Sequence, residues 1–246
     1  YVALATGGPL VALPVAANPR VQVIHNSPDA GASTVDLWVN GTTLVDDVAF
    51  RTATGFISLN TGMNTVGVAG GTSTSANDTI ANFDLDLLAG NTYIVVADGT
   101  LSGTGYSPFQ PFGLNVYTMG REAAMNADKV DVLVHHGSTD APTVDVRGAD
   151  TTTVLVDDAS YGAFAGYLEL DTLDYVIRIT DATGGTVVQS YTAPLDALNL
   201  GGAAITVVAS GFLTPANNSN GPAFGLWVAL ASGGALVELP VATVSS

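Results

Sequence analysis

The feature that most constrains this chain is an internal repeat, because two copies of one segment predict two copies of one fold. Residues 21–30 align with residues 132–141, and both segments read as an apolar strand followed by a turn with His, Ser, Asp and Ala. Further blocks follow in the same order at nearly constant spacing: 34–36 with 143–145, 44–47 with 155–158, 55–59 with 166–170, 93–97 with 204–209, and 112–114 with 224–226. We assign copy 1 to residues 18–128 and copy 2 to residues 129–246.

The repeated blocks have the two-residue periodicity of β-strands. Val35, Leu37 and Val39 alternate with polar or aromatic residues and lead into Asn40-Gly41, a frequent hairpin turn. Runs of this kind recur every 8 to 12 residues or so, as they do in β-sandwiches. The sequence therefore predicts an all-β protein with two tandem β-sandwich domains.

A third match involves the first 16 residues, which reproduce residues 227–242 with few changes. Both segments place two apolar runs around Gly-Gly, which predicts a β-hairpin that closes copy 2. Residues 1–17 are then an additional closing or donor hairpin. Three alternatives remain open: the hairpin completes copy 1 of its own chain, packs on a neighbouring molecule's sheet, or is left over from a longer array. On a neighbour, the subunit contact would be made by its apolar residues: Val2, Leu4, Leu10, Val11, Leu13 and Val15.

The charge and composition of the chain exclude several functions. The 22 acidic and 6 basic residues give a net charge of −16, which repels nucleic acid phosphates and anionic lipids. No apolar run is as long as a membrane span, so we expect no membrane insertion. The sequence contains no cysteine, which excludes disulfides and thiolate catalysis.

Histidine is the main candidate for catalysis, and its position argues against that role. His25 and His136 come at the end of the first strand of each copy, and each is followed by a serine and then by Asp29 or Asp140. Catalytic triads are normally assembled from distant segments, because side chains this close on one strand end cannot converge. We therefore predict that these four residues structure the turn, that the chain has no catalytic residues, and that it is not an enzyme.

Acidic pairs and aromatic residues are the alternative sources of a binding site. Asp46 with Asp47, and Asp157 with Asp158, recur in both copies and offer oxygen ligands, so calcium is the one cofactor that the sequence suggests. No segment has the spacing of an EF-hand loop. Aromatic side chains could instead form a carbohydrate platform: the candidates are Trp38, Tyr93, Tyr106, Phe109, Phe112, Tyr117, Tyr161 and Trp227.

Two motifs resemble a known family. His-Asn-Ser-Pro-Asp-Ala at 25–30, followed by Val-Asp in the next strand, is similar to the bacterial domain-of-unknown-function 4397 family, and so is the Phe-Gly-Leu to Leu-Pro run at 224–240. The resemblance covers nearly the whole chain as two units. It implies an immunoglobulin-like β-sandwich for each unit and an exported or cell-surface protein with no established activity. Copy 2 departs from the first motif, because Thr139 replaces Pro28.

The repeats, the duplicated hairpin and the missing catalytic constellation favour an extracellular structural protein. In this interpretation the chain is a subunit of a self-assembling filament or surface layer, and its partner is another copy of itself, joined head to tail by strand or hairpin complementation. The alternative is a monomeric secreted module that binds carbohydrate or a cell-envelope partner. Deletion of residues 1–16 distinguishes the two.

Overall fold

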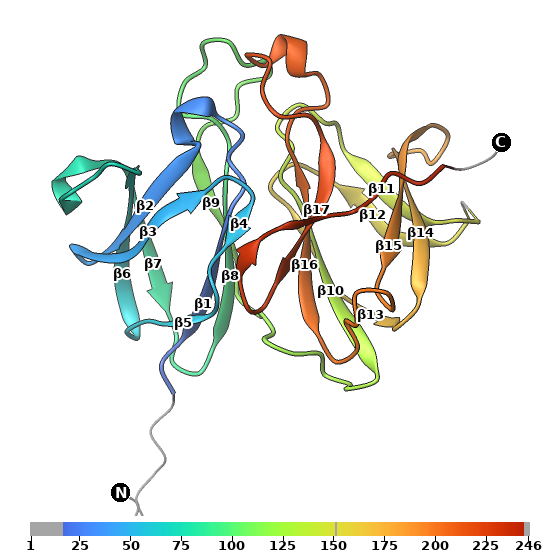
Figure 1. Ribbon diagram of the computed structural model, residues 1–246, viewed down its shortest axis with the longest axis horizontal. Coiled ribbons are helices and arrows are strands. Elements are labelled where there is room, and N and C mark those ends of the chain that lie inside the picture. The colour runs from blue at the N-terminus through green and yellow to red at the C-terminus, as the bar shows by residue number, and fades with distance from the viewer. Residues whose placement is uncertain (1–16, 151, 244–246) are drawn as a thin grey trace, which may run out of the picture.

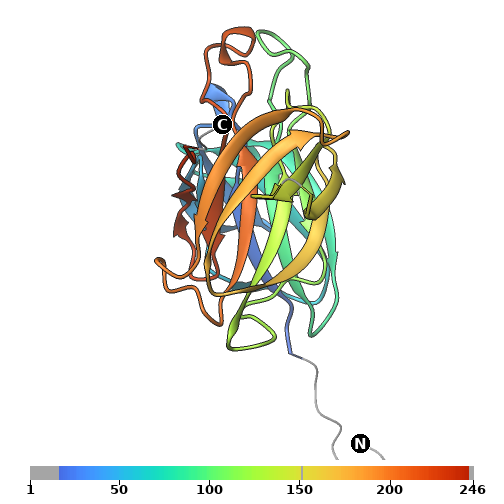
Figure 2. The ribbon, with the colours of Figure 1, turned by 90° about the vertical axis from the view of Figure 1, so that its right-hand side faces the viewer.

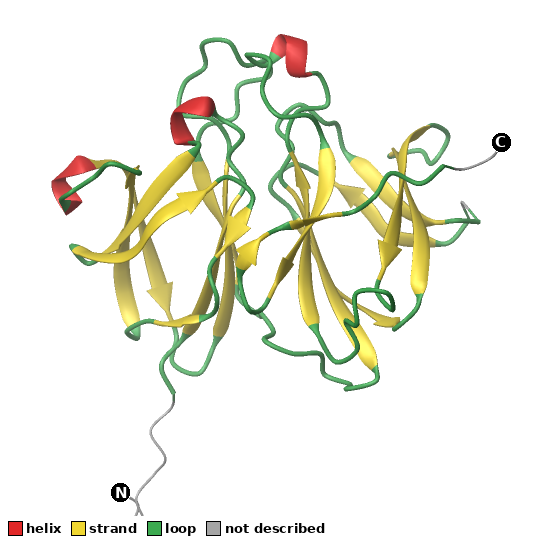
Figure 3. Cartoon of the chain, in the orientation of Figure 1, coloured by secondary structure: helices red, strands yellow, loops and turns green. Residues whose placement is uncertain are grey.

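Four β-sheets stacked as layers make up the part of the chain that the computed structural model describes, residues 17–150 and 152–243 (Figure 1). The helical elements among these residues are single turns: η1 (Ala30–Ala32), η2 (Ala76–Asp78) and η3 (Pro215–Asn217) (Figure 3). The prediction of an all-β protein with tandem sandwiches is confirmed.

Copy 1 is a sandwich of two sheets. Its outer sheet has the order β3-β2-β6-β7, and its inner sheet has the order β4-β1-β8-β9, with β5 also paired to β1. β1 and β8 are parallel. The strands are β1 (Arg20–His25), β2 (Thr34–Val39), β3 (Thr42–Ala49), β4 (Thr52–Ala53), β5 (Ile57–Ser58), β6 (Gly62–Gly70), β7 (Thr79–Leu87), β8 (Thr92–Asp98) and β9 (Gly113–Tyr117).

Copy 2 repeats this arrangement strand for strand. Its outer sheet has the order β12-β11-β14-β15, its inner sheet has the order β13-β10-β16-β17, and β10 and β16 are again parallel. β9 of copy 1 thus corresponds to β17, and β7 corresponds to β15. The strands are β10 (Lys129–His136), β11 (Val144–Gly148), β12 (Val154–Ala159), β13 (Phe164–Asp171), β14 (Asp174–Asp181), β15 (Val187–Pro194), β16 (Ala204–Ser210) and β17 (Gly225–Leu230).

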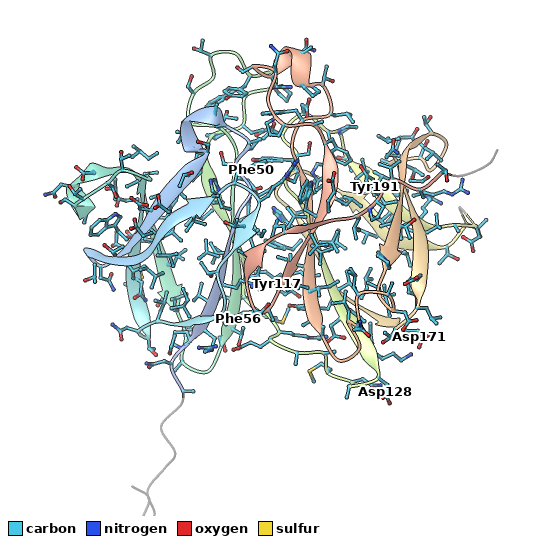
Figure 4. All side chains as sticks on the ribbon, in the orientation of Figure 1. Phe50, Phe56, Tyr117, Asp128, Asp171 and Tyr191 are labelled. Carbon is cyan, nitrogen blue, oxygen red and sulfur yellow. The ribbon has the colours of Figure 1, made fainter. Side chains whose placement is uncertain are left out.

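Three apolar cores separate the four sheets. One lies inside each sandwich, and the third lies between the two inner sheets, where it joins the copies through Ile24, Ile94, Leu133 and Val208. Phe56 and Tyr117 pack against this central core and lie between the two copies in Figure 4. Because the inner sheets are covered on both faces, β8 and β16 are almost continuously apolar rather than alternating.

The end of copy 2 also belongs to copy 1. β18 (Gly234–Ala235) pairs with β4 of copy 1, whereas β19 (Val237–Glu238) pairs with β17. Leu236 is buried in the core between the copies, and Leu239 is buried inside copy 2. We call residues 234–242 the tail. Residues 1–16, which include its counterpart 8–16 and all of the predicted contact residues Val2, Leu4, Leu10, Val11, Leu13 and Val15, lie outside the described residues.

Candidate functional site

The loops at one end of both sandwiches meet and form a common surface, at the top in Figures 1 and 2. We call this surface the loop end and define it as residues 26–33, 99–112, 137–143 and 211–224. The first and third segments contain the repeated motif, and the other two connect β8 with β9 and β16 with β17. Its construction therefore depends on what the motif residues contact.

The histidine and serine of the motif bind different backbone groups. His25 Nε2 lies 2.6 Å from the carbonyl oxygen of Ala32, across the turn that follows β1. Ser27 Oγ donates to the carbonyl oxygen of Gly99, at a distance of 2.6 Å. In copy 2, His136 Nε2 lies 3.0 Å from Pro142 O, and Ser138 Oγ donates to Gly211 O. The histidine thus closes the motif turn on itself, and the serine attaches that turn to the neighbouring loop in each copy.

The motif aspartates accept hydrogen bonds from the long loops. Asp29 accepts the backbone N–H of Leu101 at 2.8 Å and the hydroxyl of Tyr106 at 3.1 Å. Asp140 accepts three donors from the loop 211–224: the N–H groups of Leu213 and Thr214, each at 2.7 Å, and Asn218 Nδ2 at 2.9 Å. Each carboxylate therefore fixes the conformation of a loop that the sequence alone would leave undefined.

The long loops of the two copies are bound to each other. The aromatic rings of Tyr106 and Phe212 stack with their centroids 5.6 Å apart. Two hydrogen bonds cross the same boundary, from Ser107 N to Asn218 Oδ1 at 2.9 Å and from Ser219 Oγ to Gly105 O at 3.0 Å. The loop end is consequently one pre-organised surface and not two separate loop tips.

The loop end exposes apolar side chains and presents no charge on its long loops. Phe109 is 48% exposed, and Leu101 and Leu213 are 38% and 39% exposed. The segments 99–112 and 211–224 contain no Asp, Glu, Lys, Arg or His, although the chain has a net charge of −16. Of the other aromatic candidates, Tyr93 is buried, and Trp38 donates to Ser73 on copy 1's outer sheet.

The acidic pairs gather around a buried aspartate in each copy. Asp46 and Asp47 lie with Asp36, and Asp157 and Asp158 lie with Asp145, with oxygens within 4.8 Å of one another in each trio. Asp36 is fully buried and accepts the N–H of Asp47 at 2.9 Å. Asp145 accepts the N–H of Asp158 at 3.0 Å. These bonds hold the strand irregularity at which Asp47 and Asp158 adopt a positive φ; calcium binding stays a prediction.

Asp36 and Asp145 differ in their neighbours. Burial raises the pKa of Asp36, but hydrogen bonds from Ser73 and Asp47 outweigh it and lower that pKa overall. The same carboxylate raises the pKa of the exposed Asp46 beside it. In copy 2, Arg147 donates to Asp145 at 2.7 Å and supplies a positive charge instead.

A buried polar cluster between the copies was not found from the sequence. Asp98, at the end of β8, is 1% exposed and accepts Asn26 Nδ2 at 2.6 Å. Its second oxygen lies 2.7 Å from His135 Nε2 of copy 2 and 2.8 Å from Asn115 Nδ2. One signal was present: His135 stands where copy 1 has the apolar Ile24.

In copy 2, Ser210 occupies the position of Asp98, and it is contacted by Arg51 of copy 1. Arg51 Nε donates to Ser210 Oγ at 3.0 Å, and Arg51 Nη2 donates to the carbonyl oxygen of Ala223 at 2.8 Å. The guanidinium lies 4.1 Å from the ring centre of Trp227. Burial lowers the pKa of Arg51 to about 10, which leaves it protonated at neutral pH. The contacts of Asp98 and Arg51 thus bind the copies together in both directions.

We expect the two turn histidines to make the protein less stable in mild acid. Burial lowers the pKa of both His25 and His136, so the unfolded chain binds more protons below its histidine pKa of about 6.5. Stability should therefore fall as the pH drops from about 6.5 to 5, by up to about 1.4 kcal/mol per pH unit for each histidine. Urea unfolding across this range measures the slope. A His25→Gln/His136→Gln variant should show a flatter profile, and an unchanged slope would contradict the assignment.

No helix among the described residues is long and apolar enough to cross a membrane.

The chain was compared with curated proteins, solved structures and family models. No curated protein matches the sequence. Solved structures include a streptococcal virulence factor that binds α-glucan, at 10% identity, covering 78% of this chain and 93% of that chain, with a TM-score of 0.24. A family 41 carbohydrate-binding module from streptococcal virulence factors matches at 13% identity, with the same coverage of both chains and TM-score.

At these TM-scores the solved structures add nothing about the function of this chain. The family model described as "Domain of unknown function (DUF4397)" matches residues 19–114 and 130–222, which is most of the chain in two consecutive regions. The first region runs from β1 to the start of β9, the second runs from β10 to the loop before β17, and both contain the motif turn of the loop end. The chain therefore belongs to the domain-of-unknown-function 4397 family, as a tandem pair of its domains.

Proposed function

We propose that the chain is a non-catalytic binding module of an exported or cell-surface protein, and that it binds neutral carbohydrate at the loop end. The observation that carries this proposal is the chemistry of the two long loops. They join into one surface to which neither long loop contributes a charged side chain, although the protein is strongly acidic. A neutral sugar offers hydroxyl groups and apolar ring faces, and it has no charge that needs a partner.

The side chains of the loop end fit such a ligand. Phe109 offers an exposed aromatic face for a sugar ring. The same loops carry hydroxyl and amide groups that donate and accept hydrogen bonds: Ser102, Thr104, Ser107, Gln110, Thr214, Asn217, Ser219 and Asn220. Because the loops are already held by Asp29 and Asp140, binding would cost little further ordering.

The loop end also favours binding over catalysis. The motif histidines and serines are each engaged with a backbone carbonyl, so the serine hydroxyls are not bound to the histidines as a catalytic nucleophile and base would be. Binding residues on loops that a rigid β-scaffold positions are a common arrangement in recognition proteins. Secretion or display at the cell surface would give this surface access to glycans of the envelope or of another cell.

Replacing Phe109 with alanine should weaken glycan binding about tenfold, because burying an exposed aromatic side chain contributes about 1.5 kcal/mol or more and about 1.4 kcal/mol corresponds to a factor of ten in affinity. Binding of neutral polysaccharides is screened on a glycan array and then measured by isothermal titration calorimetry. Leu173→Ala is the matched control, because Leu173 is 56% exposed but lies in the turn between β13 and β14. The proposal fails if no neutral glycan binds, or if Phe109→Ala binds as well as the unchanged chain.

A further inference from the structure

Copy 1 has a free strand edge at the position where copy 2 is covered by its tail. In copy 2, β19 pairs with the outer edge of β17, and Val241 bridges Tyr191 on β15. β9 and β7 are the equivalent strands of copy 1. Among residues 17–150 and 152–243, no strand pairs with the outer edge of β9 or of β7. After β9 the chain crosses to copy 2, where the N–H of Arg121 binds the hydroxyl of Tyr167.

The side chains at this edge of copy 1 are less buried than their counterparts. Leu226 and Val228 on β17 are 5% and 1% exposed, because the tail covers them. Their equivalents on β9, Leu114 and Val116, are only partly buried. Tyr191 on β15 is 2% exposed, whereas the corresponding Phe83 on β7 is partly buried. The edge of copy 1 formed by β9 and β7 is therefore less covered than the edge that the tail closes in copy 2.

We propose that this edge binds residues 10–16 of a second copy of the chain. Residues 1–16 match residues 227–242 at 12 of 16 positions, and within them 10–16 correspond to tail residues 236–242. Leu13 corresponds to Leu239, which fills the core of copy 2. Val11 corresponds to Val237, whose register partner on β17 is Val228. The matching register on copy 1 places Val11 opposite Val116.

The same docking cannot be made by the chain's own N-terminus. The carbonyl oxygen of Ala17 accepts the N–H of Gly90, so Ala17 lies at the end of the sheet where β8 begins with Thr92. In copy 2, the N–H of Leu239 donates to the carbonyl oxygen of Leu226. The equivalent bond on copy 1 would join Leu13 to Leu114. Leu114 pairs with Ala97 on β8, so Leu13 would lie at the level of Ala97.

Ala97 is five residues along β8 from Thr92, about 16 Å at roughly 3.3 Å per residue. Four residues connect Leu13 to Ala17, and they span at most about 14 Å when fully extended. The docked strand would also lie outside β9, which adds sideways distance. Only another molecule can therefore supply the segment in this register.

Such a contact is heterologous, because the donor segment and the acceptor edge are different surfaces. After the first contact forms, the resulting dimer keeps one free donor segment and one free acceptor edge, so the assembly continues head to tail. The backbone of β9 would gain a ladder partner, and the core of copy 1 would gain apolar side chains. This inference is independent of the glycan-binding proposal, because the edge of β9 and the long loops are separate surfaces.

Disulfide crosslinking between single-cysteine chains tests the proposal, and the absence of native cysteine makes the test clean. A Val11→Cys chain is mixed with a Val116→Cys chain under mild oxidation, and a covalent heterodimer is expected on a denaturing gel. The control partner is Leu173→Cys, which is more exposed than Val116 but lies on copy 2, and it should give no heterodimer above background. Adding Leu13→Asp to the donor should abolish the crosslink. Adding Ala12→Glu should preserve it, because Glu238 occupies that position in the tail.

One further variant separates the alternatives. A chain with both Val11→Cys and Val116→Cys should form a ladder of covalent oligomers. A crosslinked monomer would overturn the proposal in favour of closure within the chain, and equal yields with Val116→Cys and Leu173→Cys would overturn the docking site. Glycan binding, measured on the same samples, reports on the loop end alone, so failure of either proposal is distinguished from failure of the other.

Discussion

Replacing Asp98 with alanine is expected to lower the free energy of unfolding by about 3–5 kcal/mol, because each buried polar group that loses its hydrogen-bond partner costs about 1–3 kcal/mol and more than one group loses a partner here. Asp98 is the shared acceptor for His135, Asn26 and Asn115 in the joint between the copies. Alanine leaves all three groups without that acceptor, and His135 and Asn26 are fully buried, so water does not replace it there. Urea denaturation followed by tryptophan fluorescence measures the change.

Two further variants assign the effect to the polar cluster. Asp86→Ala removes a carboxylate from the exposed face of β7, and it should change stability by less than about 0.5 kcal/mol. His135→Ile, which installs the residue that copy 1 carries at this position, should recover part of the loss when combined with Asp98→Ala. A loss below about 1 kcal/mol for Asp98→Ala would show that the cluster does not hold the copies together.

The repeat and its strand periodicity were sufficient to predict the sandwiches, because each aligned block falls on one strand. The block 21–30 became β1 and the motif turn, and 34–36 became the start of β2. Periodicity could not show what covers the second face of a strand. Ile24 and Val96 face the other copy, and that contact depends on how two folded sandwiches dock. The contact between the two copies could therefore not be predicted from the sequence of either repeat alone.

The sequence was sufficient to identify residues of the candidate site, but not the groups that these residues contact. The acidic pairs were recognised from their recurrence, but Asp36 and Asp145, which lie on a different strand, could be joined to them only by the fold. The motif aspartates were recognised as turn residues, whereas Asp29 also holds Leu101 and Tyr106, more than 70 residues further along the chain. Contacts at such separations leave no local pattern in a single sequence.

Truncating Leu239 to alanine should cost about 2–5 kcal/mol, the usual range for removing a fully buried leucine. Leu239 is 2% exposed and belongs to the core of copy 2, although it lies in a segment with almost no regular structure. Leu236→Ala should cost a comparable amount, but by a different route, because Leu236 packs between the two copies. Chemical denaturation of each variant gives the values.

Val241→Ala is the matched control within the tail, because Val241 is 60% exposed, and it should change stability by less than about 0.5 kcal/mol. If Leu239→Ala also changes the free energy of unfolding by less than about 0.5 kcal/mol, the tail does not close the core of copy 2. The docking inferred for copy 1 would then lack the contact on which it is based. If Leu239→Ala is costly, the same loss should appear in the oligomer when Leu13 is truncated, since Leu13 occupies the equivalent position in the donor segment. The two truncations therefore compare the free energy of equivalent leucine contacts, one within a chain at Leu239 and one between chains at Leu13.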